Sequence, residues 1–189
     1  IKIGFIARLS IEKNIGLFIQ AAYSILKECG YCRFVIIGDG LLRQSLEDLC
    51  HRLDIKWAVT FLGWQSSELL PSILSNIDIV VNPSLRAWSE TFCISNIEVM
   101  ALKIPLITFA IGGIGEYIKM PLQKSESNND LLYSIGPNAI ILNEASPIAI
   151  TEAVIKLVYN STLRQSIGEA GYNTIASYFS REIQIQKYE

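Results

Sequence analysis

Glu90 and Glu98 are two acidic residues whose spacing and position could support chemistry. Seven residues lie between them, in the stretch from Ser89 to Met100. This stretch follows a strand-like run, Asp78–Ser84, which predicts Glu90 in the loop at the carboxyl end of a strand and Glu98 in the first turns of a helix. Carboxylates accept hydrogen bonds from sugar hydroxyls, and the N–H groups at a helix start bind anions. Together they suggest a nucleotide-sugar site.

Glu98 also fits a purely structural role. Ser95-x-x-Glu98 is the pattern of a capping box, in which the glutamate side chain folds back onto the backbone N–H of Ser95. The residue types alone leave capping and ligand binding equally open.

A basic pair, Arg8 and Lys13, lies between the first strand-like run and the helix pattern after it. A guanidinium can hold two phosphate oxygens through parallel N–H groups, and a lysine adds a mobile point charge. The two side chains could therefore neutralise a diphosphate, including one that leaves as a dianion. The structural alternative is a set of local ion pairs, such as one between Lys13 and Glu12.

Glycine-containing turns follow the second and third strand-like runs. Gly38-Asp39-Gly40 allows the backbone to approach a ligand closely, but Arg43 stands where a dinucleotide fingerprint has its third glycine. We interpret it as a tight strand-to-helix turn that either only shapes the chain or also lies beside a nucleotide. Gly63 precedes Trp64, whose ring could stack on a base or cover the edge of the sheet.

The elements that must position these residues alternate along the chain. Strands are predicted at Lys2–Ala7, Arg33–Ile37, Ala58–Leu62, Ile77–Val81, Leu106–Phe109 and Ala139–Leu142, and helices at Ile15–Lys27, Leu41–Leu53, Ser67–Leu74, Ser95–Leu102, Gly113–Ile118, Pro147–Tyr159 and Ser161–Phe179. This order predicts an α/β fold, a doubly wound Rossmann-like parallel sheet of about six strands with helices on both faces. Such sheets bind ligands at the carboxyl ends of their strands, where the basic pair, the turns and the carboxylates would meet.

Composition narrows the class of protein. The chain has 189 residues, half of them hydrophobic, and a formal net charge of −2, which predicts a globular domain and gives no electrostatic reason to expect nucleic acid as a partner. It has no run of 18 apolar residues, so we expect no membrane segment. We expect one domain over residues 1–180, with a polar surface loop at 119–137, and a polar tail at 181–189 that resembles a truncated helix.

The cysteines and the single histidine are weak candidates for chemistry. Cys29-x-x-Cys32 has no second pair at zinc spacing, and we interpret the cysteines as small apolar residues in preference to redox or metal ligands. Reduced thiols fit a cytoplasmic location. His51 lies in a helix pattern with a solvated face, which argues against a Ser-His-Asp triad. Asn160-Ser161-Thr162 matches a glycosylation sequon, but its position between two helices favours a helix cap.

Taken in order, these motifs resemble the carboxyl-terminal domain of the retaining glycosyltransferases of family 4, also described as glycosyl transferases group 1, over nearly the whole chain. The segments that carry the resemblance are Ala7-Arg8-Leu9 with Lys13, Gly38-Asp39-Gly40, Phe61-Leu62-Gly63, Pro83-Ser84, Glu90 to Glu98-Val99-Met100, Lys103-Ile104-Pro105 and Gly112-Gly113-Ile114-Gly115-Glu116. The family has the GT-B fold, two facing Rossmann-like domains. The resemblance implies one half of that architecture.

It also implies roles for these residues. Arg8 and Lys13 would hold the diphosphate of a nucleoside-diphosphate sugar, Glu98 the ribose hydroxyls, and Glu90 the transferred sugar. Backbone amides at Phe92, Cys93 and Ile94 would face the sugar and phosphate. Gly38, Gly40 and Gly63 are further donor-binding candidates because of their place in the turns after the strands. Transfer to an acceptor hydroxyl would retain the anomeric configuration and need no metal or other cofactor; the chain contains no Asp-x-Asp.

Three positions depart from the family pattern: Ala7 before Arg8, Lys103 before Ile104, and Cys93 where glycine is usual. The last brings a thiol to the sugar pocket and could narrow donor choice. The chain begins within a strand pattern and without Met. We expect it to be a fragment that lacks the amino-terminal acceptor domain, its natural partner, and that is inactive alone. The alternatives are a non-catalytic nucleotide-sugar-binding module, a GT-B epimerase or hydrolase, and, less favoured, a nicotinamide-dependent oxidoreductase.

Overall fold

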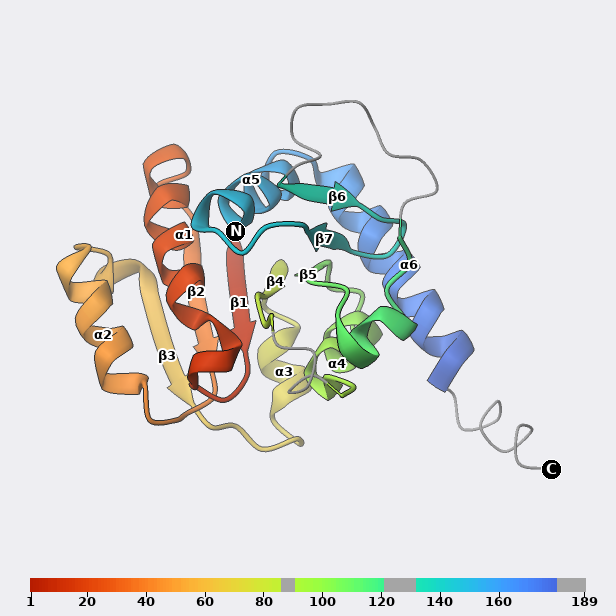
Figure 1. Ribbon diagram of the computed structural model, residues 1–189, viewed down its shortest axis with the longest axis horizontal. Helices are drawn as coiled ribbons and strands as arrows, with labels where there is room; N and C mark the ends of the chain where they lie inside the picture. The colour runs from red at the N-terminus through yellow and green to blue at the C-terminus, as the bar shows by residue number, and fades with distance from the viewer. Residues whose placement is uncertain (86–90, 121–131, 180–189) are drawn as a thin grey trace.

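A single sheet runs through the protein, with strand order β3-β2-β1-β4-β5-β7-β6 (Figure 1). The structure, a computed structural model, describes residues 1–85, 91–120 and 132–179. The strands are β1 (Lys2–Ile6), β2 (Arg33–Ile37), β3 (Val59–Gly63), β4 (Ile79–Asn82), β5 (Leu106–Thr108), β6 (Tyr133–Ile135) and β7 (Ile140–Leu142). Neighbouring strands are parallel except β6 and β7, which pair antiparallel.

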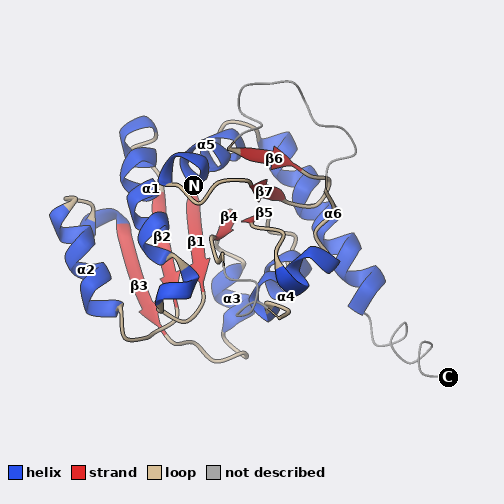
Figure 2. Cartoon of the chain, in the orientation of Figure 1, coloured by secondary structure: helices blue, strands red, loops and turns tan. Residues whose placement is uncertain are grey.

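Helices cover both faces of the sheet (Figure 2). They are α1 (Ile15–Glu28), α2 (Arg43–Arg52), α3 (Leu70–Leu74), α4 (Ile94–Ala101), α5 (Pro147–Val158) and α6 (Ser161–Phe179), with short 3-10 turns η1 (Ile11–Lys13), η2 (Lys56–Ala58) and η4 (Gly112–Glu116). Helices α1, α2 and α5 share one hydrophobic core and α3 and α4 share the other, while α6 contributes Ile167 to the first and Ile175 to the second. The doubly wound α/β fold is therefore confirmed.

The strands feed both cores because successive side chains point to opposite faces. In β4, Ile79 and Val81 pack into the core of α1 and α5, whereas Val80 between them packs into the core of α3 and α4. Ile36 and Ile37 in β2 divide in the same way. A strand buried on both faces reads as an unbroken apolar run, which is why these strands were visible in the sequence.

Asn160 and Ser146 start the last two helices through their side chains. Asn160 Oδ1 accepts a hydrogen bond of 2.9 Å from Leu163 N, which confirms the interpretation of its sequon-like triplet as a helix cap. Ser146 Oγ accepts one of 3.1 Å from Ala149 N, with Pro147 at the first helical position.

Three sequence expectations need correction. The sheet has seven strands instead of about six, because β6 lies within the segment 119–137 that was expected to be a loop. It spans three residues of which only Tyr133 is buried, too few to show a period. The helices expected at Ser67–Leu74 and Gly113–Ile118 shorten to α3 and η4.

The tail at 181–189 lies outside the described residues. Among the helices that are described, none is long and apolar enough to cross a membrane.

Candidate functional site

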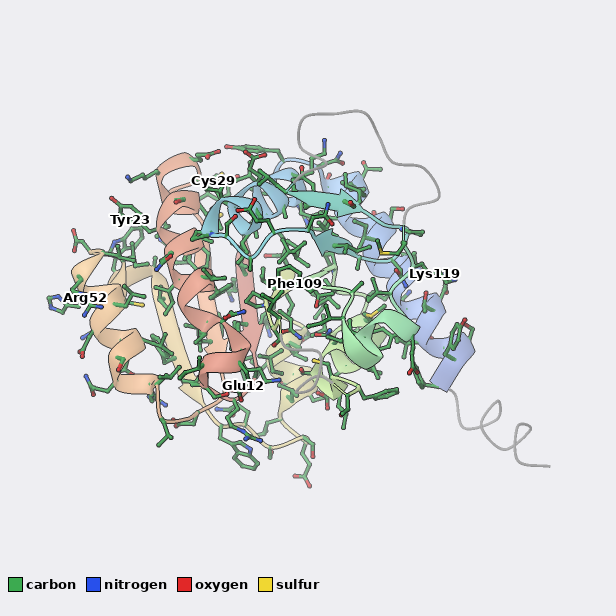
Figure 3. The ribbon with its side chains drawn as sticks, in the orientation of Figure 1. Glu12, Tyr23, Cys29, Arg52, Phe109 and Lys119 are labelled. Carbon is green, nitrogen blue, oxygen red and sulfur yellow. The ribbon has the colours of Figure 1, made fainter. Side chains whose placement is uncertain are left out.

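The strand order reverses its direction between β1 and β4, and we call this position the crossover of the sheet. These strands are neighbours, yet α1, which follows β1, packs on one face and α4, which follows β4, packs on the other. In open α/β sheets, ligands bind at such a point, between the loops that leave the carboxyl ends of the strands toward opposite faces, and we call this region the crevice. Figure 3 shows Glu12, in the loop after β1, at this end of the molecule, with Tyr23, Cys29 and Arg52 toward the other.

The loop after β1 carries the basic pair. Arg8 is exposed and makes no ion pair or hydrogen bond with the described residues, while Lys13 is half-buried. Glu12 between them accepts a 2.5 Å hydrogen bond from Ser10 Oγ, and this bond is the main reason that its pKa lies below the usual range. The charges of Lys13 and Arg8 lower that pKa further. Both cations therefore lie close enough to Glu12 to affect the pKa of its carboxyl group.

Asn14 ties the β1 loop to the β4 loop across the crevice. Its Nδ2 donates to the carbonyl oxygen of Pro83 at 3.0 Å, and its backbone is left-handed, with φ of 51°. Sequence reasoning assigned it no role. The available signal was an asparagine directly before a helix, since asparagine tolerates the left-handed region better than most residues.

The glycine turn supports the same loop from the side of β2. A Cβ at Gly38, where φ is +129°, would lie 1.9 Å from the carbonyl oxygen of Ala7, and one at Gly40 would lie 2.5 Å from that of Leu9. Gly38 N also donates to Gly63 O at 2.8 Å. These glycines allow three strand ends to pack closely, so their shaping role is visible in the structure. Their contact with a nucleotide stays a prediction.

Glu98 is not part of a capping box. The N-cap of α4 is Cys93, with no side-chain cap, so Ser95 already lies inside the helix. The Glu98 carboxylate is half-buried, forms no hydrogen bond or ion pair with the described residues, and has its pKa raised by burial. A partly desolvated carboxylate without a protein partner is suited to accept hydrogen bonds from a ligand. Glu90, its companion in the sequence, lies outside the described residues.

The start of α4 is anchored from below by aromatic rings. The Tyr117 hydroxyl donates to Phe92 O at 3.0 Å, and the Phe92 ring meets the Phe179 ring edge-on at 5.1 Å between centroids. Gly113 packs against the backbone of Thr91 so closely that a Cβ added to it would lie 1.7 Å from Thr91 O. Tyr117 and Phe179 were not singled out from the sequence, because their contacts depend on the fold alone. The anchoring leaves Ile94 68% exposed at the helix start.

A buried polar cluster lies directly beneath this helix start. Asn82, Ser84 and Asn96 are at most 3% exposed. Asn82 Nδ2 donates to Asn96 Oδ1 at 2.8 Å and to Cys93 Sγ at 3.0 Å. Ser84 Oγ and Asn96 Nδ2 have no hydrogen-bond partner among the described residues. Buried polar atoms in this state are uncommon in folded proteins, so this cluster differs from the rest of the core.

Two further sequence candidates lie at the same edge. Trp64 is 75% exposed, so little of its surface packs against the protein, and Glu116 is an exposed residue at the end of η4. His51 is exposed on α2, as expected. Within residues 1–85, 91–120 and 132–179, no three His, Cys, Asp or Glu side chains gather where they could hold a metal ion.

The model of the family described as glycosyl transferases group 1 matches residues 1–174. The chain belongs to this family. It is 35% identical over 136 residues to an uncharacterized glycosyltransferase of Methanocaldococcus jannaschii, covering 72% of this chain and 33% of that protein. It is 32% identical over 115 residues to an alpha-D-kanosaminyltransferase of Streptomyces kanamyceticus, covering 61% and 29%. The chain thus spans about a third of the length of these glycosyltransferase relatives.

Solved structures of glycosyltransferases share the fold. TarM of S. aureus, in a complex that includes UDP, matches 99% of this chain with 34% of its own, at a TM-score of 0.81 and 22% identity. HepE of Anabaena, in complex with UDP and glucose, matches 99% of this chain with 46% of its own, at a TM-score of 0.80 and 18% identity. The C-terminal domain of a glycosyl transferase group 1 family protein from Francisella tularensis matches 95% of this chain with 86% of its own, at a TM-score of 0.77 and 24% identity. The fold is one Rossmann-like half of a GT-B architecture.

Proposed function

We propose that this glycosyltransferase group 1 chain is the donor-binding domain of a retaining, family 4 enzyme that transfers a sugar from a nucleoside diphosphate to an acceptor hydroxyl. The observation that carries the proposal is the arrangement at the β1–β4 crossover. Arg8 and Lys13 lie on the loop after β1, and the half-buried Glu98, which has no hydrogen bond or ion pair with the described residues, lies on the helix after β4. The UDP complexes of TarM and HepE, which share the fold, support the same ligand class.

The residues divide the work by charge. Arg8 and Lys13 hold the diphosphate, and with the N-terminal end of α4 they stabilise the negative charge that develops as the nucleotide leaves. This arrangement replaces a divalent cation, so we propose a reaction that uses neither metal nor cofactor. Glu98 accepts hydrogen bonds from the ribose hydroxyls, and Glu90 contacts the transferred sugar.

The acceptor would bind to a second domain that faces this one, as the share of the relatives' length that this chain covers suggests. The 189-residue chain alone therefore binds donor without transferring it. We further propose a cytoplasmic setting. Retention is tested on a chain that includes the second domain, by the NMR coupling constant of the anomeric proton in the first product formed.

A thermal-shift series tests donor binding. UDP, GDP, ADP and NAD are added separately to the wild type, to Arg8→Ala and to Arg52→Ala. Arg52 is the matched control because it is an exposed arginine at the end of α2, away from the crevice. A nucleoside diphosphate at 100 times its Kd should stabilise the wild type and Arg52→Ala by about 2.7 kcal/mol, and Arg8→Ala should lose most of this. Stabilisation by NAD alone, or the same loss in both variants, would contradict the proposal.

A further inference from the structure

Cys93 differs from the other cysteines of the chain in where it lies. Cys29, Cys32 and Cys50 are each at most 1% exposed, and burial raises the pKa of the Cys32 and Cys50 thiols to about 11. Cys93 is only half-buried and is the N-cap of α4. All four are described, and none is in a disulfide. Cys93 packs against the edge of one core, so a soluble reagent meets one partly exposed cysteine and three that the core protects.

The sulfur of Cys93 lies among polar groups, one of which donates a hydrogen bond to it. Asn82 Nδ2 donates to it at 3.0 Å, and the Ser95 hydroxyl lies 3.4 Å away. The Asn82 amide is held in this orientation because its Oδ1 accepts from Ser84 N at 3.2 Å and its Nδ2 also donates to Asn96 Oδ1. Donors fixed on a sulfur at a helix N-terminus stabilise the thiolate, which is the nucleophilic form of cysteine.

The same cluster has unused hydrogen-bonding capacity. Asn96 is 1% exposed, and its Nδ2 finds no partner among the described residues, although its Oδ1 accepts from the amide that contacts the sulfur. The Ser84 hydroxyl, in a residue that is 0% exposed, is in the same state. Both donors belong to residues that are hydrogen-bonded to Asn82, the residue whose amide contacts the sulfur, so the cluster around the thiol retains capacity for an added acceptor. This observation is independent of the helix end and of the cysteine itself.

We propose that Cys93 is a modification site that exchanges with small soluble disulfides of the glutathione class and thereby closes the donor crevice. The Cys93 thiolate attacks one sulfur of the disulfide, a new S–S bond forms, the original S–S bond breaks, and the second half leaves as a thiolate. A thiol reverses the step in the same way. The closing of the crevice rests on the proposed function, because the start of α4 is where the donor sugar and phosphate are placed.

Oxidised glutathione added to the folded chain tests the site, with intact-mass analysis and peptide mapping as the readout. The wild type should gain one glutathionyl group, on Cys93, and the group should leave on addition of dithiothreitol. Cys93→Ser should gain none under the same conditions, and Cys50→Ala should still gain one. In urea all four cysteines should react, which shows that folding confers the selectivity. Equal labelling of the buried cysteines in the folded chain, or none on Cys93, would overturn the proposal.

Competition with UDP tests the closing of the crevice. Saturating UDP should slow labelling of Cys93 at least tenfold, and the labelled chain should lose its thermal shift with UDP until dithiothreitol is added. A labelled chain that still binds UDP as well as the unlabelled one would overturn this part. The outcome is separable from a failure of the proposed function. If the unlabelled chain ignores every nucleotide while Cys93 still labels selectively, the modification site stands and the donor assignment falls.

Discussion

The two ends of the sheet carry similar side chains that are engaged differently. At the amino ends of the strands, the Arg33 guanidinium lies 4.8 Å from the centre of the Trp57 ring and donates to Cys32 O at 2.7 Å. At the carboxyl ends, Arg8 and Glu98 make no hydrogen bond or ion pair with the described residues. Arg8 and Glu98 therefore keep hydrogen-bonding capacity for a ligand, whereas part of the Arg33 guanidinium is already engaged by the protein.

The amino end also has a structural reason for its charges. Lys27 lies in the last turn of α1 and Arg52 in the last turn of α2, where cations are stabilised by the helix dipole. A cleft of about 530 Å³ is present there, lined by His51, Asp54, Lys56 and Trp57. The indole N–H of Trp57 donates to Asp54 O. A cleft and a basic surface are therefore insufficient to identify a site, whereas unpartnered polar groups at a crossover are more informative.

The largest difference between the ends should appear in their glycines. Gly38→Ala places a Cβ 1.9 Å from Ala7 O at a positive φ, whereas Gly30→Ala, at the amino end, meets Leu26 O at 3.8 Å, an ordinary contact. We expect Gly38→Ala to lower the free energy of unfolding by about 2–4 kcal/mol and Gly30→Ala to change it by less than about 0.5 kcal/mol. Urea denaturation measures both. Similar values for the two variants would show that the β1–β2 loop packing is not as tight as the backbone distances indicate.

A second contrast concerns the acidic residues. Glu98→Ala should weaken UDP binding about tenfold to hundredfold, equivalent to about 1.5–3 kcal/mol for a hydrogen bond to a charged group. Glu28→Ala, an exposed residue at the end of α1, should leave it unchanged. Isothermal titration calorimetry gives both values. A 2′,3′-dideoxy analogue of UDP should bind wild type and Glu98→Ala equally. If the wild type still bound this analogue more tightly, Glu98 would not be the residue that binds the ribose hydroxyls.

Residues with a left-handed backbone conformation occur at both ends of the sheet, and glycine substitutions there should change the free energy of unfolding in opposite directions. Asp54, with φ of 56°, follows α2, and Asp54→Gly should raise the free energy of unfolding by about 0.5–1 kcal/mol by relieving the backbone. Asn14→Gly relieves the same strain but removes the 3.0 Å bond to Pro83 O, so we expect a net loss of up to about 1 kcal/mol and weaker UDP binding. Denaturation and calorimetry distinguish them; a gain in Asn14→Gly would mean that this bond does not hold the crevice together.

The smallest effect is the pH dependence from Glu98. Its pKa is raised by burial in the folded chain, so its contribution to stability is most favourable below the unfolded pKa of about 4.3 and declines as pH rises through the folded pKa. Glu98→Gln should therefore gain stability over the wild type between about pH 4 and pH 7, by less than about 1 kcal/mol because solvent screens a half-buried group. Glu68→Gln, at an exposed position, is the control. Unfolding curves with no pH-dependent difference would indicate a solvated carboxylate.

The sequence predicted the parts of this fold that depend on neighbours along the chain. The β2 and β4 runs are apolar on both faces, and residue type is enough to find them. β6 was missed because three edge residues carry no period, and Ser95 was weighed as a cap because the pattern matched, although the helix begins earlier, at Ile94. The contact that joins the two sides of the crevice, Asn14 to Pro83, spans 69 positions. Its two ends meet through strand order, which no local pattern encodes.

Residue types and spacing were therefore sufficient for the alternating architecture, the family, and the placement of Arg8, Lys13 and the glycine turns after their strands, whereas the binding roles of these residues stay predictions. Local sterics, side-chain chemistry and apolar periodicity act over a few residues. The folded chain decided which groups have partners. Glu98 takes no part in a capping box, the Cys93 sulfur accepts a hydrogen bond from the buried Asn82 amide, and the Arg33 guanidinium lies over the Trp57 ring. Partnering depends on distances in three dimensions, and these follow from packing two cores against one sheet.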